Sequence, residues 1–255
     1  MHGYVAIIIP VIQYNLNRIL KISWIDADSR AEADALLAWN GRGAVQLFDA
    51  DREEGALLLE RLDAGTTLES LPPDSAIEVA GRLLRRLAIP APDWARPLPG
   101  IAAELRESLP VRWAACGQPF DRGVLDRTTR LIDLLGPECR GALVNSDLHY
   151  RNVLAGKRDS WLAIDPKAVA GDPEFGVAPL LWQKFGAIQN IRELARRMKI
   201  VCRAADLDEA RAYGWSYVRI VDYWLWSVEL GYTENPARCE RLVRLLESCL
   251  AAGSS

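Results

Sequence analysis

The chain has 255 residues, of which 50% are hydrophobic, and this length allows one two-lobed unit or two small domains with a sizeable core. A formal net charge of −3 with interspersed arginines argues against a nucleic-acid surface, which usually gathers basic residues on one face. No apolar run approaches the roughly 20 residues of a membrane span and no signal-like segment opens the sequence, so we expect a cytoplasmic protein without membrane contact.

The N-terminal part of the chain predicts a small sheet that carries one helix. Short apolar or β-branched runs are typical of strands, and one segment between them has helical periodicity. The pattern changes at Leu62, so we expect one lobe over residues 1–62 and another over residues 63–255. The predicted strands are Tyr4–Val11, Arg18–Trp24, Val45–Asp49 and Ala56–Arg61, and the predicted helix is Ser29–Trp39.

Beyond Leu62 the periodicity is almost entirely helical. A proline-rich stretch, Pro90–Gly100, predicts a long surface connection between two helices. The segment Ala142–Ile164 is the exception, because its short apolar runs predict strands joined by turns. The predicted helices are Asp74–Leu87, Ile101–Ala115, Arg122–Leu135, Val177–Phe185, Ile191–Ala204, Leu207–Leu230 and Pro236–Ala251.

The strand-and-turn segment carries the residues that point to chemistry. It reads Asn145-Ser-Asp147-Leu-His149-Tyr-Arg-Asn152, and Asp165 follows the next strand pattern. Phosphoryl transfer needs a group that orients or deprotonates the acceptor hydroxyl, and oxygen ligands for magnesium on the nucleotide phosphates. We expect Asp147 to act on the hydroxyl with His149 in a supporting role, and Asn152 and Asp165 to hold Mg2+ bound to ATP. The alternative is that these side chains only cap turns or end a strand.

Three stretches of this region resemble one family closely. They read Asp147-Leu-His-x-x-Asn-Val-Leu-Ala-Gly, Trp161-Leu-Ala-Ile-Asp-Pro-Lys and Gly171-Asp-Pro. Their wording and spacing resemble the aminoglycoside phosphotransferases, and in particular the streptomycin 6-kinase and hydroxyurea phosphotransferase subgroup, over nearly the whole chain. The resemblance implies an α+β, protein-kinase-like bilobal fold, with a small strand-rich N-lobe and a larger helical C-lobe.

The same resemblance implies an activity and its partners. We expect ATP-dependent phosphorylation of a hydroxyl on a small, cationic or polyhydroxylated acceptor, streptomycin or a relative in the first place. A kinase for another small metabolite stays open as an alternative within the same chemistry. A nucleotide-binding remnant with little or no turnover is the alternative from a different class. Protein-kinase activity is disfavoured, because no Asp-Phe-Gly or Ala-Pro-Glu segment is present.

Four residues near the N-terminus are candidates for nucleotide binding. In a kinase-like lobe, Lys21 would grip the phosphates and Glu32 would be its ion-pair partner. The backbone at Glu60 and Leu62 would pair with the adenine edge. The alternatives are a solvated strand lysine, a capping box in which Glu32 bonds back to Ser29, and an edge strand that runs into a turn.

Two departures from the family pattern bear on the rigidity of the catalytic loop. Asn145 and Ser146 stand where the family usually has His-Gly, and Gly176 stands where it normally has an acidic residue. We therefore expect a looser loop with its chemistry retained. Asp172 could still hydrogen-bond to the loop, or it could be a simple helix N-terminal anion.

The acceptor is expected in the helical lobe. Four residues of the predicted helix Leu207–Leu230 fall near one face, at i, i+7, i+11 and i+14: Trp215, Asp222, Trp226 and Glu229. Carboxylates suit cationic groups, and indole faces suit a sugar ring. We expect Asp222, Trp226 and Glu229, together with Trp182, Gln183 and Asp172, to contact the acceptor. The alternative is that the tryptophans are core residues and that Asp222 pairs with Arg219 on a solvated surface.

The first strand pattern also carries an expectation about assembly. Counted back from Lys21, Tyr4–Val11 corresponds to the second strand of a kinase-like lobe, so the lobe would lack its first strand and most of its glycine-rich loop. The sheet of five strands would then expose an isoleucine-rich edge. We expect weak ATP binding, slow turnover and self-association through that edge.

Overall fold

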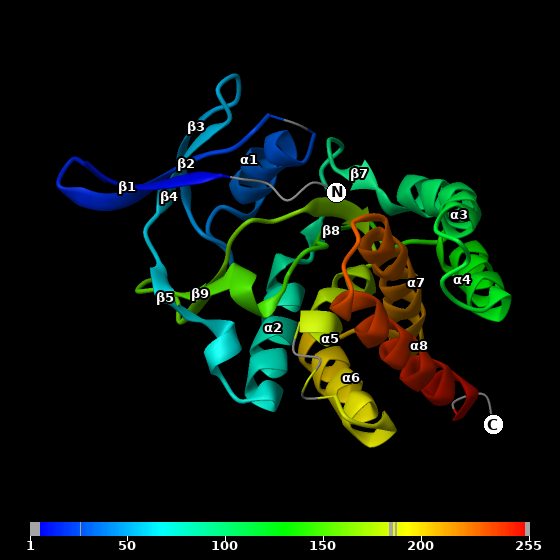
Figure 1. Cartoon of the computed structure of the whole chain (residues 1–255). Helices are drawn as coiled ribbons and strands as arrows, with labels where there is room; N and C mark the ends of the chain where they lie inside the picture. Colours follow the sequence, from blue (N-terminus) through cyan, green and yellow to red (C-terminus); the bar gives the residue numbers. More distant parts are fainter. Residues whose placement is uncertain (1–5, 26, 184–185, 187, 253–255) are drawn as a thin grey trace.

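The computed structural model describes residues 6–25, 27–183, 186 and 188–252, and it has a strand-rich part followed by a helical part (Figure 1). The first part forms an antiparallel sheet with one helix beside it, as the periodicity predicted. Its elements are β1 (Ile7–Gln13), β2 (Leu16–Ile22), α1 (Ala27–Trp39), β3 (Leu47–Asp51) and β4 (Ala56–Glu60).

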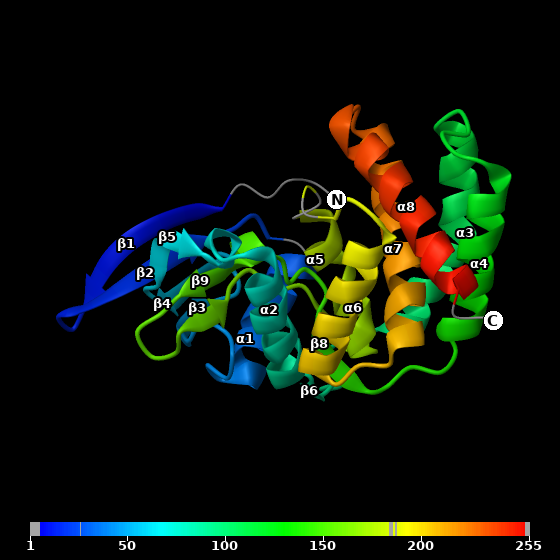
Figure 2. The same ribbon diagram turned by 90° about the horizontal axis from the view of Figure 1, so that it is seen from below.

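The N-terminal sheet has four strands in the order β1-β2-β4-β3, and they correspond to the four strands that the sequence predicted. Strands β1 and β2 form a hairpin whose two turn residues, Tyr14 and Asn15, have φ values of 50° and 62°. Two successive positive φ values are typical of the tight hairpin turn whose twist matches that of the strands. The hairpin projects away from the helical part (Figure 2), with β1 as an edge strand of the sheet.

The two parts of the chain share one core. At the end of α1, the Trp39 indole N–H donates to the backbone oxygen of Leu87, at 2.8 Å. The loop before β3 also pairs with the helical part, since the Val45 N–H donates to the oxygen of Ala163, at 2.8 Å. A lobe boundary at Leu62 stays a prediction, because such contacts cross it.

The helical part follows from amphipathic segments with recognisable ends. Helix α2 begins with Pro73 in its first turn and ends with Arg85 and Arg86, as the helix dipole favours. It packs on α6, where a side chain at Gly81 would meet the Ala204 Cβ at 2.8 Å. Among the described residues, no helix has the length and apolar character needed to cross a bilayer. The helices are α2 (Pro73–Leu87), α3 (Leu98–Ala115), α4 (Arg122–Leu135), α5 (Ala178–Gln183), α6 (Ile191–Ala205), α7 (Glu209–Glu229) and α8 (Glu234–Ala252), with 3-10 turns η1 (Leu68–Ser70), η2 (Tyr150–Asn152) and η3 (Pro173–Gly176).

Seven short strands also belong to this part, and four of them were missed. The prediction of helices alone outside Ala142–Ile164 was wrong, because strands of two to five residues are too short to show a period. Pro90–Gly100 is likewise no simple connection, since it holds part of β6, all of β7 and the start of α3. The two sheets have the orders β10-β9-β5 and β6-β8-β11-β7, with strands β5 (Asp63–Thr67), β6 (Ile89–Pro90), β7 (Arg96–Pro97), β8 (Ala142–Asn145), β9 (Val153–Ala155), β10 (Trp161–Ala163) and β11 (Ala168–Gly171).

Candidate active site

The loop that follows β8 is braced by the fully buried side chain of Asn145. Its amide oxygen accepts the backbone N–H groups of Asp147, at 3.1 Å, and of Lys167, at 3.3 Å. The backbone N–H of Ser146 donates to the oxygen of Lys167, at 2.8 Å. Asn145 therefore braces the loop through its amide oxygen, which binds two backbone donors of the site, and a looser loop stays a prediction.

The two predicted metal ligands are held next to the same loop. The side-chain N–H2 of Asn152 donates to the backbone oxygen of Asp147, at 3.4 Å, and its backbone oxygen accepts the N–H of Ile164, at 2.9 Å. Asp165 follows directly and has a φ of 52°, a left-handed conformation that aspartate tolerates better than most residues. Because the amide nitrogen of Asn152 is bonded, its oxygen is the atom suited to a cation.

A buried ion pair, Lys21 with Glu32, contacts one of these residues. The Lys21 ammonium lies 2.7 Å from a carboxylate oxygen of Glu32 and also contacts the Asp165 carboxylate. Burial lowers the pKa of Lys21, but attraction to Glu32 and Asp165 outweighs it, so this pKa lies above its ordinary value. Lys21 thus stays charged, and it joins the N-terminal sheet to the loop that carries Asp165.

Arg219 is a second brace, which no local pattern of the sequence indicates. This α7 side chain is partly buried, and its guanidinium donates to the backbone oxygens of Ser146 and of Phe175, the latter at 3.1 Å. Burial lowers the pKa of Arg219, and the charges of Asp147 and Asp222 counteract that shift. The alternative that placed Arg219 in a surface pair with Asp222 was wrong, because this guanidinium is taken up by two backbone oxygens of the core.

Gly176 ends the turn η3 where the family pattern has an acidic residue. A Cβ there would lie 2.8 Å from the Leu84 side chain and 3.0 Å from the backbone oxygen of Asn145. A larger residue would have to displace the base of the catalytic loop. Close approach, more than backbone freedom, therefore requires glycine at this position.

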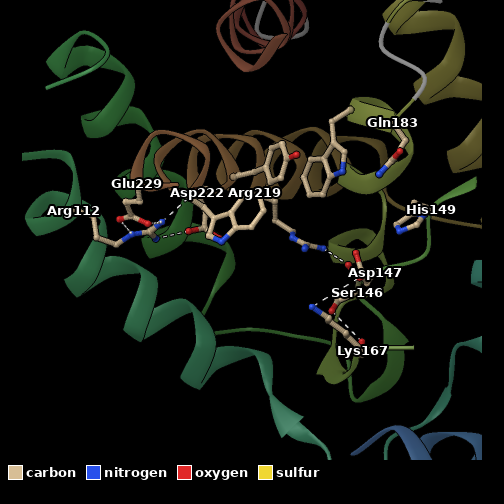
Figure 3. A pocket seen from close by; sticks show the side chains of 12 residues that line it. Arg112, Ser146, Asp147, His149, Lys167, Gln183, Arg219, Asp222 and Glu229 are labelled. Atoms are coloured by element: carbon tan, nitrogen blue, oxygen red, sulfur yellow. Dashed lines mark hydrogen bonds and ion pairs between the residues drawn. The ribbon is translucent and has the colours of Figure 1, made fainter. Parts of the chain in front are cut away.

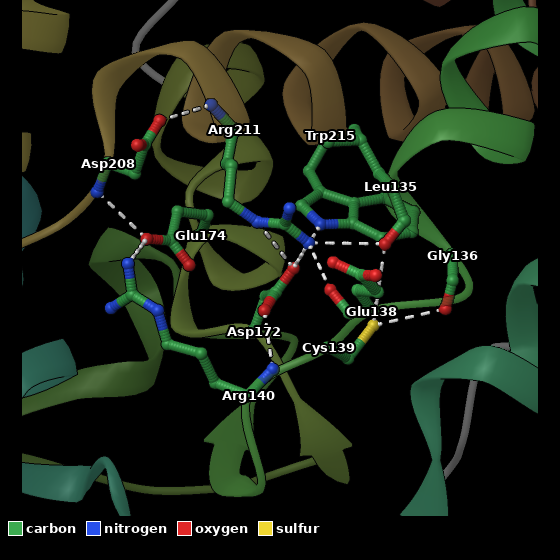
Figure 4. A network of polar contacts seen from close by, with 10 residues as sticks. All are labelled: Leu135, Gly136, Glu138, Cys139, Arg140, Asp172, Glu174, Asp208, Arg211 and Trp215. Atoms are coloured by element: carbon green, nitrogen blue, oxygen red, sulfur yellow. Dashed lines mark hydrogen bonds and ion pairs between the residues drawn. The ribbon is translucent and has the colours of Figure 1, made fainter.

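Asp172 does not line the pocket that holds the other predicted acceptor residues, described below, which corrects our prediction. Its carboxylate is fully buried and accepts the backbone N–H of Arg140, the Trp215 indole N–H and the Arg211 guanidinium (Figure 4). These bonds tie the start of η3 to α7. Asp172 is a structural residue because it is sealed from any bound ligand, and Trp215, also fully buried, belongs to the core.

One pocket of about 510 Å3 gathers most of the predicted acceptor and catalytic residues (Figure 3). Its aromatic wall is a stack in which Trp182 lies 4.7 Å from Tyr223, and Tyr223 lies 5.3 Å from Trp226, between ring centroids. Tyr223 was not among the predicted contacts, although it follows Asp222 directly on α7 and precedes Trp226 by three residues. The lining residues are Arg112, Ser146, Asp147, His149, Lys167, Trp182, Gln183, Arg219, Asp222, Tyr223, Trp226 and Glu229.

The two ends of this pocket differ in their charged groups. At one end, the Lys167 ammonium lies 4.0 Å from the Asp147 carboxylate. At the other end, the Arg112 guanidinium lies 2.5 Å from a carboxylate oxygen of Asp222 and 2.7 Å from one of Glu229. One end therefore pairs a lysine with one carboxylate, and the other pairs an arginine with two.

His149 faces the pocket with an unusual ring environment. Its Nδ1 is buried and has no hydrogen-bond partner, although the ring is only partly covered. Burial lowers the pKa of His149, and the positive charge of Arg151 lowers it further. The negative charges of Asp147 and Asp165 act in the opposite direction but do not outweigh burial. The ring is therefore neutral at pH 7. It suits a neutral hydrogen bond near Asp147, in the supporting role that we predicted, better than an ionic contact.

The segment between β4 and β5 has a separate hollow beside it, of about 780 Å3. Glu60 and Leu62 line it, whereas Lys21 and Asp165 do not. The Glu60 carboxylate bonds to the Arg158 guanidinium, at 2.9 Å, and its backbone N–H donates to the oxygen of Gln46, at 2.8 Å, so neither group is available for a base edge. The two predicted adenine contacts therefore lie in the same hollow. Lys21, which is predicted to contact the phosphates, does not line it.

Taken with the fold, a braced aspartate loop facing a buried lysine defines a small-molecule kinase of the protein-kinase-like class. Solved structures of that class share the fold at low identity. The apo form of a thermostable mutant of aminoglycoside phosphotransferase APH(4)-Ia has a TM-score of 0.65 and 15% identity, covering 100% of this chain and 94% of the other. Choline kinase LicA from Streptococcus pneumoniae has a TM-score of 0.60 and 15% identity, covering 94% and 90% of the two chains.

Sequence relatives narrow the class to a family. A streptomycin 6-kinase of Streptomyces glaucescens is 38% identical over 237 residues, covering 90% of this chain and 77% of the relative. A hydroxyurea phosphotransferase of Kitasatospora aureofaciens is 38% identical over 243 residues, covering 93% and 70%. The chain belongs to the aminoglycoside/hydroxyurea antibiotic resistance kinase family, whose model matches residues 3–231.

Proposed function

We propose that the protein is an ATP-dependent O-phosphotransferase that acts in the cytoplasm on a hydroxyl of streptomycin or a related aminoglycoside. The observation that carries the proposal is the position of the Asp147 carboxylate, which lines the acceptor pocket while its backbone is bonded to Asn152. Both curated relatives described above are phosphotransferases, one for streptomycin and one for hydroxyurea. Their acceptors support a small molecule as the acceptor of this protein.

The nucleotide would lie between the N-terminal sheet and the loop. Lys21, held by Glu32, would contact its phosphates, and the backbone at Glu60 and Leu62 would meet the adenine edge. The Asp165 carboxylate and the Asn152 amide oxygen fit a magnesium ion, since this metal commonly takes one or two protein oxygens together with phosphates and water. When bound, it would neutralise charge on the transferring phosphoryl group.

The acceptor hydroxyl would be placed at Asp147. The carboxylate orients the O–H or accepts its proton while the hydroxyl oxygen bonds to the γ-phosphorus and the bond to the ADP oxygen breaks. Lys167, whose ammonium is 4.0 Å from that carboxylate, would stabilise negative charge at the same point. His149, Trp182 and Trp226 would line the space around the acceptor, with Asp222 and Glu229 at the far end.

The direct test is acceptor-dependent phosphorylation by the purified chain. We expect ADP release with Mg-ATP and streptomycin, and a phosphorylated product in mass spectrometry. ATP binding with no acceptor-dependent release for any hydroxyl compound would instead support a nucleotide-binding remnant. Release with another small metabolite, but with neither streptomycin nor hydroxyurea, would support a kinase for that metabolite.

Self-association through β1 is a second proposal, which rests on exposed apolar side chains. Ile8 is 56% exposed and Ile12 is 75% exposed on an edge strand of the sheet. Unpaired strand edges of this kind pair readily with other chains. Sedimentation should show concentration-dependent dimers for the wild type and fewer for Ile12→Lys. Equal distributions for the two proteins would remove this proposal.

A further inference from the structure

The cationic side chain of Arg112 occupies the far end of the acceptor pocket (Figure 3). It comes from the last turn of α3, and its partners Asp222 and Glu229 come from α7. Its Nη1 donates to Asp222, at 2.5 Å, while Nε and Nη2 donate to the two oxygens of Glu229, at 2.7 and 3.1 Å. One guanidinium therefore binds both carboxylates of this end.

The ion pair changes the charge that an acceptor would meet. Without Arg112, the far end would present two carboxylates beside the aromatic stack, which is an environment suited to a cation. With Arg112 in place, those charges are largely neutralised. Burial lowers the pKa of Arg112, but its bonds to Glu229 and Asp222 outweigh burial, so the pKa lies above its ordinary value and the charge is permanent.

The group bound here also indicates which ligand chemistry the end can hold. A guanidinium is planar and presents a fork of N–H donors that matches carboxylate oxygens. Asp222 and Glu229 are arranged around such a group already, and Tyr223 and Trp226 lie on the same helix between them. A guanidinium on a ligand would find the same donor-to-acceptor geometry if the Arg112 side chain moved away.

The Arg112 side chain has room to leave. Its side chain is 24% exposed, and those of Asp222 and Glu229 are 35% and 34% exposed. A charge pair that water can reach costs less to separate than a buried one, because water solvates the charges once they part. The catalytic end differs, because the Arg219 guanidinium there is bonded to backbone oxygens.

We propose, on the basis of the proposed function, that Asp222 and Glu229 form a subsite for a guanidinium or ammonium group of the acceptor, and that Arg112 is its internal competitor. In the empty pocket Arg112 occupies the subsite. A cationic acceptor binds by displacing it, and a neutral acceptor binds with Arg112 in place. Arg112 thereby sets the balance between cationic and uncharged acceptors.

The test compares Arg112→Gln with wild type and with Arg106→Gln. Arg106 lies on the same helix and pairs with Asp133 away from the pocket, so it is a matched control. Binding is followed by tryptophan fluorescence, because Trp182 and Trp226 line the pocket. The ligands are streptomycin, which bears guanidinium groups, and hydroxyurea, which is uncharged. We expect Arg112→Gln to lower the Kd for streptomycin about tenfold and to change that for hydroxyurea less than about twofold.

The control and a second variant make the result decisive. Arg106→Gln should leave both Kd values unchanged, and Glu229→Gln should weaken streptomycin binding in the Arg112→Gln background. Weaker or unchanged streptomycin binding in a folded Arg112→Gln protein overturns the proposal. An equal change in the Kd for streptomycin and for hydroxyurea overturns it as well, and so does the absence of binding for both ligands. Binding needs no turnover, so a tenfold shift without phosphorylation would reject only the proposed reaction, and phosphorylation without the shift would reject only the role of Arg112.

Discussion

The two ends of the acceptor pocket are held by different kinds of contact. At the catalytic end, the brace of Asn145 and the brace of Arg219 both act on backbone atoms of the loop. At the far end, Arg112 contacts Asp222 and Glu229 mainly through half-exposed side chains. Backbone bonds fix the position of a reacting group, which phosphoryl transfer requires above all.

The difference suggests how a family keeps its reaction while its acceptors vary. A substitution at the far end alters charge without moving Asp147, whereas a substitution at the catalytic end moves the loop itself. The stacked rings of Trp182, Tyr223 and Trp226 lie between the two ends and suit many ring-shaped ligands. The comparison predicts large effects on turnover at one end and effects on acceptor binding at the other.

The largest effect is expected at Asp147. Asp147→Asn keeps the size of the side chain but loses its charge, so turnover should fall by roughly two or more orders of magnitude, with nucleotide affinity nearly intact. Steady-state kinetics and calorimetric ATP titration measure the two quantities. Asp126→Asn, at a surface ion pair on α4, is the control and should behave as wild type. Unchanged turnover in Asp147→Asn would show that Asp147 does not act on the acceptor hydroxyl and that this end of the pocket is not the catalytic one.

Asp165 should affect nucleotide binding as well as the reaction. In Asp165→Ala the predicted metal ligand and a partner of Lys21 are both lost. We expect magnesium-dependent ATP affinity to fall by about tenfold or more, and turnover to fall with it. Asp159→Ala, in the β9–β10 turn, serves as the control. A titration that gives the same Mg-ATP affinity for Asp165→Ala and wild type would count against Asp165 as a ligand.

The sequence predicted one shared loop for Asp147 and Asn152 because these residues are close along the chain. Asp147 and Asn152 lie in one turn between short apolar runs, and that local pattern carries both spacing and chemistry. The far end could not be predicted in the same way. Arg112 and Asp222 are 110 positions apart, and nothing local to either residue indicates that α3 packs beside α7.

Burial was the other property that the sequence left open. From the sequence, Asp172 and Asp222 were equally plausible acceptor contacts. In the structure, Asp172 is fully buried in a polar network, whereas Asp222 lines the pocket. Arg219 was given a solvated alternative, although its guanidinium is bonded to two backbone oxygens beside the pocket. A helical period places a residue on a face, whereas the neighbours of that face depend on tertiary packing.

A moderate effect is expected at Asn145, where the brace can be removed without touching a reacting group. Asn145→Ala leaves two backbone N–H groups without their acceptor, which costs about 1–3 kcal/mol for a buried donor. We expect a lower unfolding temperature and roughly tenfold slower turnover, with KM for the acceptor little changed. Thr128→Val, which removes a buried hydroxyl from α4, is the control for stability alone. Lower stability with wild-type turnover would show that the loop holds its position without Asn145.

The smallest effect concerns protons at His149. Because burial lowers the pKa of this ring in the folded protein, the unfolded chain binds a proton more readily as the pH falls below about 6.5. The contribution of the neutral ring to stability is therefore present above that pH and is lost between it and the lower folded pKa. Thermal unfolding at pH 7.5 and 5.5 should show a larger loss for wild type than for His149→Gln, in which no proton is taken up at this position. Ionisable groups far from the ring are common to the two proteins, so their contributions cancel in the comparison. Equal losses would mean that the His149 ring is hydrated in solution and that this part of the catalytic end is more open than its buried Nδ1 indicates.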